Sequence, residues 1–387
     1  MAAASGLPFG LVTETLPVLL RTRGASLAAV GDLSAAQLPW TLKFLWAPLV
    51  DRIGRRRAWI VGCLVGICLL LLPFRTLDPT APGAGFWLAL LALVALSATQ
   101  DIAIDAYTVE STRREELGTA NAVRIGTYRA AMFVGGGSLV ALAGLVSWDA
   151  ALAAAATVLL LLACIAWRSP EYRPLPGGPA PDLGAPLREL LGRPGIAPVL
   201  AFALLFKLGD ALLDPMARAF WVDRGLSPAE IGGPVTTGRL VGTTLGAVIG
   251  GVLTSRLGLR RGLLGFGALQ ALSNAGYWWA ASTGAGLGGI VAVAVLENLC
   301  GGLGTAAFVA YLMSVCDRRF AATQYALLSA ALAATRALAG PLAGRLDERL
   351  GHPAFFALTL ALAFPALLLV PGLSRATPPA DAPPPAA

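Results

Sequence analysis

The chain has 387 residues, of which 56% are hydrophobic and only 13% are charged. Soluble globular proteins carry about 25% charged residues, so this composition cannot cover a water-facing surface of the size such a chain would need. The apolar residues occur in blocks of about 20, the length that crosses the ~30 Å hydrocarbon core of a bilayer as a helix. These features predict an integral membrane protein and exclude a soluble enzyme.

The apolar blocks are separated by charged residues, glycine and proline, and they predict twelve transmembrane helices. In chain order the expected helices cover residues 4–20, 30–50, 58–74, 84–106, 118–146, 150–167, 196–222, 228–254, 262–281, 286–314, 322–345 and 353–373. The predicted fold class is therefore all-α and membrane-embedded, with 12 transmembrane helices in two pseudo-symmetric six-helix bundles.

The predicted domain organisation follows from the segments that are not apolar. Residues 168–195 are rich in proline and glycine and are expected to form a cytoplasmic linker between the bundles 1–167 and 196–373. Residues 374–387 are rich in proline and alanine and are expected to be disordered. The first expected helix is short and has no basic segment before it, so it is not a signal peptide, and we expect the natural chain to start further upstream.

The formal net charge of +7 comes mainly from arginines that flank the apolar blocks. They are concentrated in alternate loops and in the central linker, which by the positive-inside rule places both termini in the cytoplasm. The charge therefore does not indicate nucleic-acid binding. The five cysteines have no metal-binding or disulfide spacing, and the one histidine is His352, so neither a metal nor a cofactor is expected.

A basic loop motif occurs in both predicted bundles. Residues 51–57 read Asp-Arg-Ile-Gly-Arg-Arg-Arg, and residues 255–261 read Ser-Arg-Leu-Gly-Leu-Arg-Arg. The motif resembles the D-R-x-G-R-R loop of the major facilitator superfamily, whose two bundles rock about a midplane cavity. We expect it to act as a conformational latch rather than to contact substrate. Its residues are Asp51, Arg52, Gly54, Arg55, Arg56, Arg256, Gly258 and Arg260.

Ionisable side chains within apolar spans are costly and mark functional positions. Asp101 and Asp105 are one helical turn apart and share a face of the helix 84–106. Two such carboxylates cannot both ionise cheaply in a low-dielectric cavity, which favours proton coupling. A structural ion pair with Arg124 or Arg129 of the next helix is the alternative, and both interpretations stay open.

The second predicted bundle carries a similar set of ionisable side chains. Lys207 and Asp210 are three residues apart, a spacing that fits an intrahelical pair at least as well as a substrate contact. Glu297 has no basic neighbour in its own helix, which favours a functional role. The proton-coupling candidates are Asp101, Asp105 and Glu297. The substrate-cavity candidates are Glu14, Lys43, Gln100, Arg124, Arg129, Lys207, Asp210 and Asn298.

Two other patterns concern packing and depth in the membrane. Glycine recurs at every fourth position of the helix 228–254, which predicts a stripe for close helix contact. The stripe consists of Gly238, Gly242, Gly246 and Gly250. Tryptophans near the ends of spans are expected in the interfacial aromatic belt. These are Trp148, Trp221, Trp278 and Trp279.

Longer motifs resemble those of the AmpG-type muropeptide permeases over nearly the whole chain. They are residues 5–8 (Ser-Gly-Leu-Pro), 43–49 (Lys-Phe-Leu-Trp-Ala-Pro-Leu), 100–102, 105–106, 128–129, 135–136, 207–211 (Lys-Leu-Gly-Asp-Ala), 273–278, 297–302 (Glu-Asn-Leu-Cys-Gly-Gly) and 322–330. The resemblance implies proton-coupled import of anhydromuropeptides across the bacterial inner membrane for cell-wall recycling. It also implies functional roles for Lys43, Asp101, Asp105, Arg129, Lys207, Asp210 and Glu297.

Two alternative functions stay open. The first is import of a siderophore or another amphiphilic conjugate by the same fold, and the second is a transporter-like sensor that binds without transport. An enzyme is not expected, because no nucleophile–base or metal constellation appears in the sequence. The expected partners are membrane lipids, a small glycopeptide substrate and protons, and the protein is expected to be a monomer.

Overall fold

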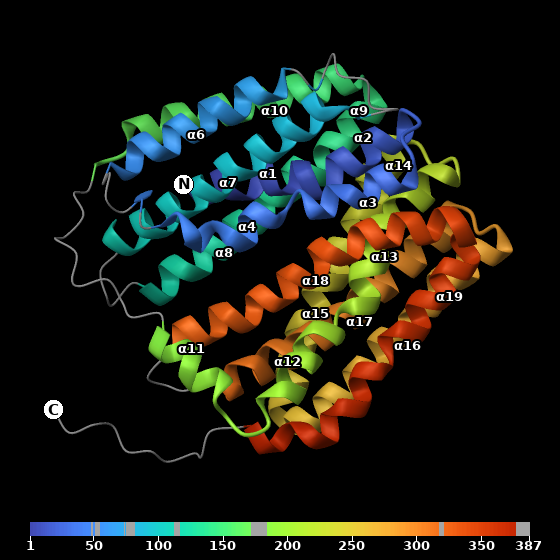
Figure 1. The fold of residues 1–387 in the computed structure, drawn as a ribbon. Coiled ribbons are helices and arrows are strands. Elements are labelled where there is room, and N and C mark those ends of the chain that lie inside the picture. Colours follow the sequence, from blue (N-terminus) through green and yellow to red (C-terminus); the bar gives the residue numbers. More distant parts are fainter. Residues whose placement is uncertain are drawn as a thin grey trace, which may run out of the picture.

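The computed structural model describes residues 1–47, 49–50, 55–72, 74, 82–111, 117–171, 184–316 and 321–376. Within these ranges the chain is helical and forms two bundles, the first drawn above the second in Figure 1. The first bundle contains α1 (Ala2–Gly10), η1 (Leu11–Thr15), α2 (Leu16–Thr22), α3 (Leu27–Ala35), α4 (Leu38–Leu42), η2 (Lys43–Leu45), α6 (Arg56–Leu71), α7 (Ala84–Ser111), α8 (Leu117–Phe133), η5 (Val134–Ser138), α9 (Leu139–Leu145) and α10 (Trp148–Arg168).

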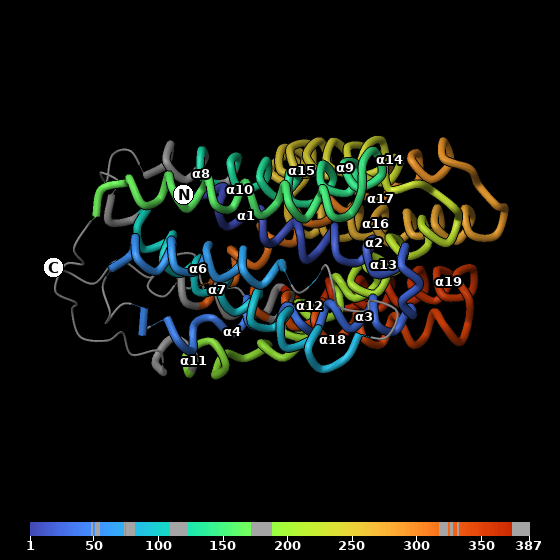
Figure 2. The backbone as a smooth tube through the Cα atoms, turned by 90° about the horizontal axis from the view of Figure 1, so that it is seen from above, coloured from blue at the N-terminus to red at the C-terminus, as the bar shows by residue number. Residues whose placement is uncertain are grey.

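The second bundle follows the short helix α11 (Gly184–Leu191). It contains α12 (Ile196–Leu205), α13 (Leu208–Asp223), α14 (Pro228–Glu230), η6 (Ile231–Val235), α15 (Thr236–Leu257), α16 (Leu259–Thr283), α17 (Leu287–Val315), α18 (Ala321–Leu350), α19 (His352–Ala363) and η8 (Pro365–Ala376). Seen from above, the start of α1 lies at the same end of the molecule as α11, whereas α14 and α19 lie towards the other end (Figure 2).

Eight helical stretches among the described residues are long and apolar enough to cross a membrane. They are Ala2–Thr22, Ala84–Thr108, Gly126–Leu145, Trp148–Arg168, Ile196–Asp223, Pro228–Leu257, Leu287–Val315 and His352–Leu373. Each coincides with a predicted span, and the other four predicted spans correspond to α3 with α4, to α6, to α16 and to α18. Large apolar side chains such as Leu88 and Leu245 are exposed on the outer faces, as contact with lipid requires. The chain is therefore a multi-pass membrane protein.

Two of the predicted helices are interrupted rather than continuous. The predicted helix 30–50 breaks after α3, and Pro39 lies at the start of α4, where it lacks the N–H that would continue the earlier helix. The predicted helix 196–222 breaks between α12 and α13, and Lys207 has a non-helical backbone (φ −106°, ψ 9°). Broken helices near the middle of a membrane are typical of substrate and ion sites in transporters.

The glycine stripe of α15 packs against α17, as predicted. A Cβ atom on Gly246 would lie 2.1 Å from the carbonyl oxygen of Leu299, and one on Gly242 would lie 2.6 Å from that of Val295. Both distances are shorter than any real carbon–oxygen contact, so the two helices meet backbone to backbone only because these residues have no side chain.

The two bundles meet at two similar backbone contacts. On one side α3 crosses α18, and a Cβ atom on Gly31 would lie 2.2 Å from the carbonyl oxygen of Gly340. On the other side α9 crosses α14, and a Cβ atom on Gly144 would lie 2.2 Å from the backbone nitrogen of Ala229. Both contacts lie towards the end that carries the turns at residues 23–26 and 224–227, which we call the closed end.

The repeated loop motif is only partly within the described residues. Asp51, Arg52 and Gly54 lie outside them. Arg55 is exposed at the start of α6, and the buried Arg56 donates a 3.0 Å hydrogen bond to the carbonyl oxygen of Val50. In the second copy, Gly258 joins α15 to α16 with φ 86°, and Arg256 and Arg260 are exposed on either side of it. The latch role of this motif stays a prediction.

Candidate functional site

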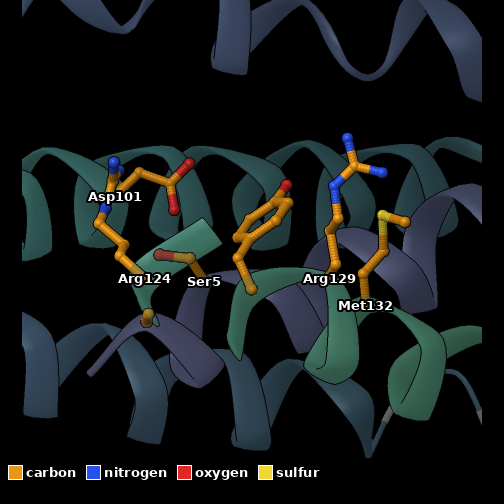
Figure 3. A pocket seen from close by; sticks show the side chains of 7 residues that line it. Ser5, Asp101, Arg124, Arg129 and Met132 are labelled. Atoms are coloured by element: carbon orange, nitrogen blue, oxygen red, sulfur yellow. The ribbon is translucent and has the colours of Figure 1, made fainter. Parts of the chain in front are cut away.

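A cavity of about 460 Å³ lies in the first bundle between α1, α7 and α8 (Figure 3). Its lining consists of Ala2, Ser5, Asp101, Arg124, Tyr128, Arg129 and Met132. The cavity thus brings together one predicted proton-coupling residue and two predicted substrate-cavity residues. In Figure 3, Asp101 and Arg124 lie at one end of the cavity, and Arg129 and Met132 lie at the other.

The acidic end of this cavity is neutralised by neighbouring cations. Lys43 Nζ lies 3.6 Å from Asp101 Oδ2 and 3.9 Å from Asp105 Oδ2. Arg124 forms an ion pair with Asp105. Two carboxylates are therefore balanced by two cations. The structure contains the ion pair with Arg124 that the sequence allowed as the alternative to proton coupling.

Polar groups without partners mark the two ends of the cavity. Arg129 is exposed to it and forms no hydrogen bond or ion pair with the described residues. Asp101 Oδ1 is buried and accepts no hydrogen bond from them. The amide of Gln100 is likewise without a partner there, but its side chain is fully buried and does not line the cavity. Buried polar groups are normally hydrogen-bonded, so Asp101 Oδ1 indicates a position for water or a ligand at its end of the cavity.

In the second bundle, Lys207 occupies the break between α12 and α13. Its ammonium group lies 2.7 Å from Gln270 Oε1, 3.1 Å from Asp210 Oδ2 and 3.3 Å from the carbonyl oxygen of Gly301. An ammonium group has three N–H donors, and here all three have acceptors. The predicted intrahelical pair is therefore present, and it also joins the break to α16 and α17.

Glu297 and Asn298 lie on α17 beside this cluster. Asn298 Nδ2 donates to Glu297 Oε2 at 2.6 Å, and Asn298 Oδ1 accepts a 3.0 Å hydrogen bond from Thr243 Oγ1. Glu297 forms no ion pair within the described part of the chain, although Lys207 and other charged groups lie close enough to interact with it electrostatically. It thus differs from Asp101 and Asp105, which face cations directly.

The most extensive ion network among the described residues joins the two bundles near mid-span. Arg218 forms a two-pronged contact with Glu14, with Nη2–Oε1 at 2.5 Å and Nε–Oε2 at 2.9 Å. Arg239 Nη1 donates to the same carboxylate at 2.9 Å, and its Nη2 donates to Asp214 Oδ1 at 2.6 Å. Arg218 Nη1 lies 3.0 Å from Asp214 Oδ2. Only Glu14 comes from the first bundle.

Of this network, the sequence predicted Glu14 alone as a site residue. Arg218 and Arg239 are ionisable residues inside predicted spans, so the rule that selected Glu14 could have selected them too. Trp221 was predicted to lie in the interfacial belt, and this prediction is wrong. Trp221 is fully buried beneath Arg239, whose guanidinium carbon lies 5.4 Å from the ring centroid, because this face of α13 points towards the network rather than towards lipid.

A second set of ion pairs joins the bundles at the closed end. Arg21 contacts both carboxylate oxygens of Asp223, at 2.6 and 2.7 Å. Asp223 also contacts His352 at 2.9 Å. On the α3–α18 side, Asp32 pairs with Arg345 at 2.8 Å. These contacts, together with the Glu14 network, hold the bundles together from mid-span to the closed end.

Comparison with known proteins identifies relatives over nearly the whole chain. The family model described as Major Facilitator Superfamily matches residues 1–213. An anhydromuropeptide permease of Escherichia coli (strain K12) is 38% identical over 380 residues, which is 95% of this chain and 77% of that protein. A putative transporter AmpG 4 of Rickettsia conorii is 27% identical and covers 96% of this chain and 94% of its own.

Solved structures with the same fold include two transporters. The nucleoside transporter NupG superimposes with a TM-score of 0.74 at 13% identity, covering 96% of both chains. An inward-facing bacterial homologue of the human lysosomal transporter Spinster gives a TM-score of 0.69 at 17% identity, covering 97% of this chain and 93% of the other. At these identities the likeness shows the fold alone.

Proposed function

The chain belongs to the major facilitator superfamily and to its anhydromuropeptide permease family, and on this premise we propose that it imports anhydromuropeptides across the bacterial inner membrane as a proton-coupled symporter. The observation that carries the proposal is the 38% identity to the Escherichia coli permease over 95% of the chain. The relatives described above are named as a permease and a transporter, which favours import of a muropeptide over import of a siderophore and over a sensor without transport. The protein is a transporter and not an enzyme.

Arg129 is the residue that we propose to hold a carboxylate of the substrate. Anhydromuropeptides are glycopeptides with free carboxylates, and a guanidinium group binds a carboxylate through two parallel hydrogen bonds. Lys43, Arg124 and Lys207 each lie close to an acidic partner. Arg129, which lines the cavity without such a partner among the described residues, is therefore available for a ligand.

Glu297 is the residue that we propose to take up the coupled proton. Protonation of Asp101 or Asp105 would remove the partner of a nearby cation, whereas Glu297 can be protonated without breaking an ion pair in the described part of the chain. Asp101 and Asp105 remain the other candidates. One proton that moves down a potential of ~100 mV supplies about 2.3 kcal/mol, enough for roughly 50-fold accumulation of substrate.

We further propose that the structure is inward-facing. The positive-inside rule puts both termini in the cytoplasm, so the closed end would face the periplasm. The cavity is lined by residues from the start of α1 and from α8, and it lies at the opposite end of the molecule from the closed end with its ion pairs. Access from the cytoplasm is consistent with release of an imported substrate.

The test is uptake of labelled anhydromuropeptide into proteoliposomes with an acidic, positive exterior. We expect accumulation that a protonophore abolishes. Glu297→Gln should remove accumulation but retain exchange of substrate across a membrane without a gradient. Arg349→Gln, which changes an exposed cation at the end of α18, far from the cavity, is the control. The absence of both accumulation and exchange in the folded wild-type protein would contradict the proposed substrate. Full accumulation by Glu297→Gln would refute the coupling role.

A further inference from the structure

We infer that Arg218 and Arg239 form an exchangeable carboxylate site, occupied by Glu14 when the bundles are closed there and by a carboxylate of the transported molecule when they separate. The identity of the second occupant rests on the function proposed above. The inference assigns a binding role to two arginines of the second bundle and a competing role to one glutamate of the first.

The charges of the network require an anion in this place. Within the hydrogen-bonded network, the second bundle contributes two guanidinium groups and the carboxylate of Asp214, which leaves an excess of one positive charge. Glu297 and Arg336 of the same bundle also interact electrostatically with the network, and their opposite charges cancel when both are ionised. The side chains of Arg218 and Arg239 are only 4% and 12% exposed. A buried cation without a partner is strongly unfavourable, so separation of the bundles needs a replacement for Glu14.

The two arginines are held in position by their own bundle. Asp214 contacts both guanidinium groups, and its carbonyl oxygen accepts a 2.7 Å hydrogen bond from Arg218 Nη1. The ring of Trp221 supports Arg239 from below. The arginines would therefore keep their arrangement when Glu14 withdraws, and the vacated position matches the planar two-oxygen geometry of any carboxylate.

The network is partly exposed. The Asp214 side chain is 52% exposed and that of Glu14 is 19% exposed, so the network borders open space and is not sealed in the core. Glu14 lies in η1, a π-helical turn between α1 and α2. Such turns within α-helices are rare and frequently occur at functional sites.

The other contacts between the bundles do not have this property. When Arg21 moves away from Asp223, Asp223 keeps His352 as a partner. When Asp32 leaves Arg345, the cation that remains is more than half exposed and is solvated by water. Among these ion pairs between the described parts of the two bundles, only the withdrawal of Glu14 removes an anion from two buried guanidinium groups, which is why we place the exchange at this site.

The experiment compares ligand binding by three full-length proteins in detergent: the wild type, Glu14→Gln and Asp32→Asn. The probes are an anhydromuropeptide with free carboxylates and the same compound with every carboxylate amidated. Glu14→Gln removes the competing charge, so we expect at least tenfold tighter binding of the free acid and unchanged binding of the amide. Asp32→Asn also removes an ion pair between the bundles, but it should change both affinities by the same factor.

If Glu14→Gln changes both affinities equally, the network is only a latch and the inference is overturned. Arg239→Gln gives the converse check, because it should reduce the preference for the free acid to the part that Arg129 contributes. A second measurement does not depend on the natural substrate: acetate, but not acetamide, should raise the unfolding temperature of Glu14→Ala and leave that of the wild type unchanged. Equal effects of both compounds on Glu14→Ala would overturn the inference, whereas failure of the wild type to bind anhydromuropeptide would refute only the proposed function.

Discussion

Replacement of Lys207 by methionine separates its structural role from a role in transport. The side chain is almost fully buried, and its ammonium group satisfies Asp210, Gln270 and the carbonyl oxygen of Gly301. Lys207→Met leaves the carboxylate of Asp210 without its cation, and Asp210 Oδ1 already has no hydrogen-bond partner among the described residues. Loss of one partner of a buried pair costs about 3–5 kcal/mol, so we expect a loss of stability of that size.

The double variant Lys207→Met/Asp210→Asn decides between the two roles. Because no uncompensated charge remains, we expect it to recover most of the lost stability, as measured by tryptophan fluorescence during thermal unfolding of the detergent-solubilised protein. Uptake by proteoliposomes is measured on the same samples. A purely structural pair predicts that transport recovers together with stability. Stable protein without transport would refute that reasoning and identify one of the two residues as a ligand.

Three other substitutions test the packing and the cavity. Gly246→Val should destabilise the protein by about 1–3 kcal/mol, because a Cβ atom there would lie 2.1 Å from the carbonyl oxygen of Leu299. Gly251→Val is the control and should change the unfolding temperature much less, because a Cβ atom at Gly251 would have no neighbour within 4 Å apart from its own helix. Arg129→Gln should raise the KM for anhydromuropeptide about tenfold or more with little change in unfolding temperature, and an unchanged KM would contradict its role. Asp105→Asn should impair transport less than Glu297→Gln in the accumulation assay, and the reverse order would move the coupled proton to α7.

Local features of the site could be predicted from the sequence, whereas contacts between the bundles could not. The pair Lys207–Asp210 follows from a spacing of three residues on one helix, and the pair Asp105–Arg124 was one of two interpretations for neighbouring helices. Glu14 was recognised as a costly charge in an apolar span. Its partner Arg218 is 204 residues away in the chain, and such a contact depends on how two separately folded bundles dock.

The fold itself was largely predictable, because hydrophobic blocks of the required length define spans independently of their tertiary contacts. The direction in which a side chain points was harder to predict from the sequence. Trp221 lies near the end of a span, as interfacial tryptophans do, yet its face of α13 is determined by the charged side chains that must be covered inside the protein. Similarly, the break at Lys207 contains no proline, and it becomes understandable only from the three acceptors that surround the ammonium group.

The two glycine contacts between the bundles bear on the mechanics of transport. Where side chains interdigitate, one helix cannot rotate against another until they disengage, and this creates a barrier to motion. At Gly31 with Gly340, and at Gly144 with Ala229, smooth backbone surfaces touch instead. The two contacts lie on opposite sides of the bundle interface, and the bundles can rotate relative to each other about them. The cost of switching then falls on the ion pairs rather than on repacking, and charge can set the rate of the cycle.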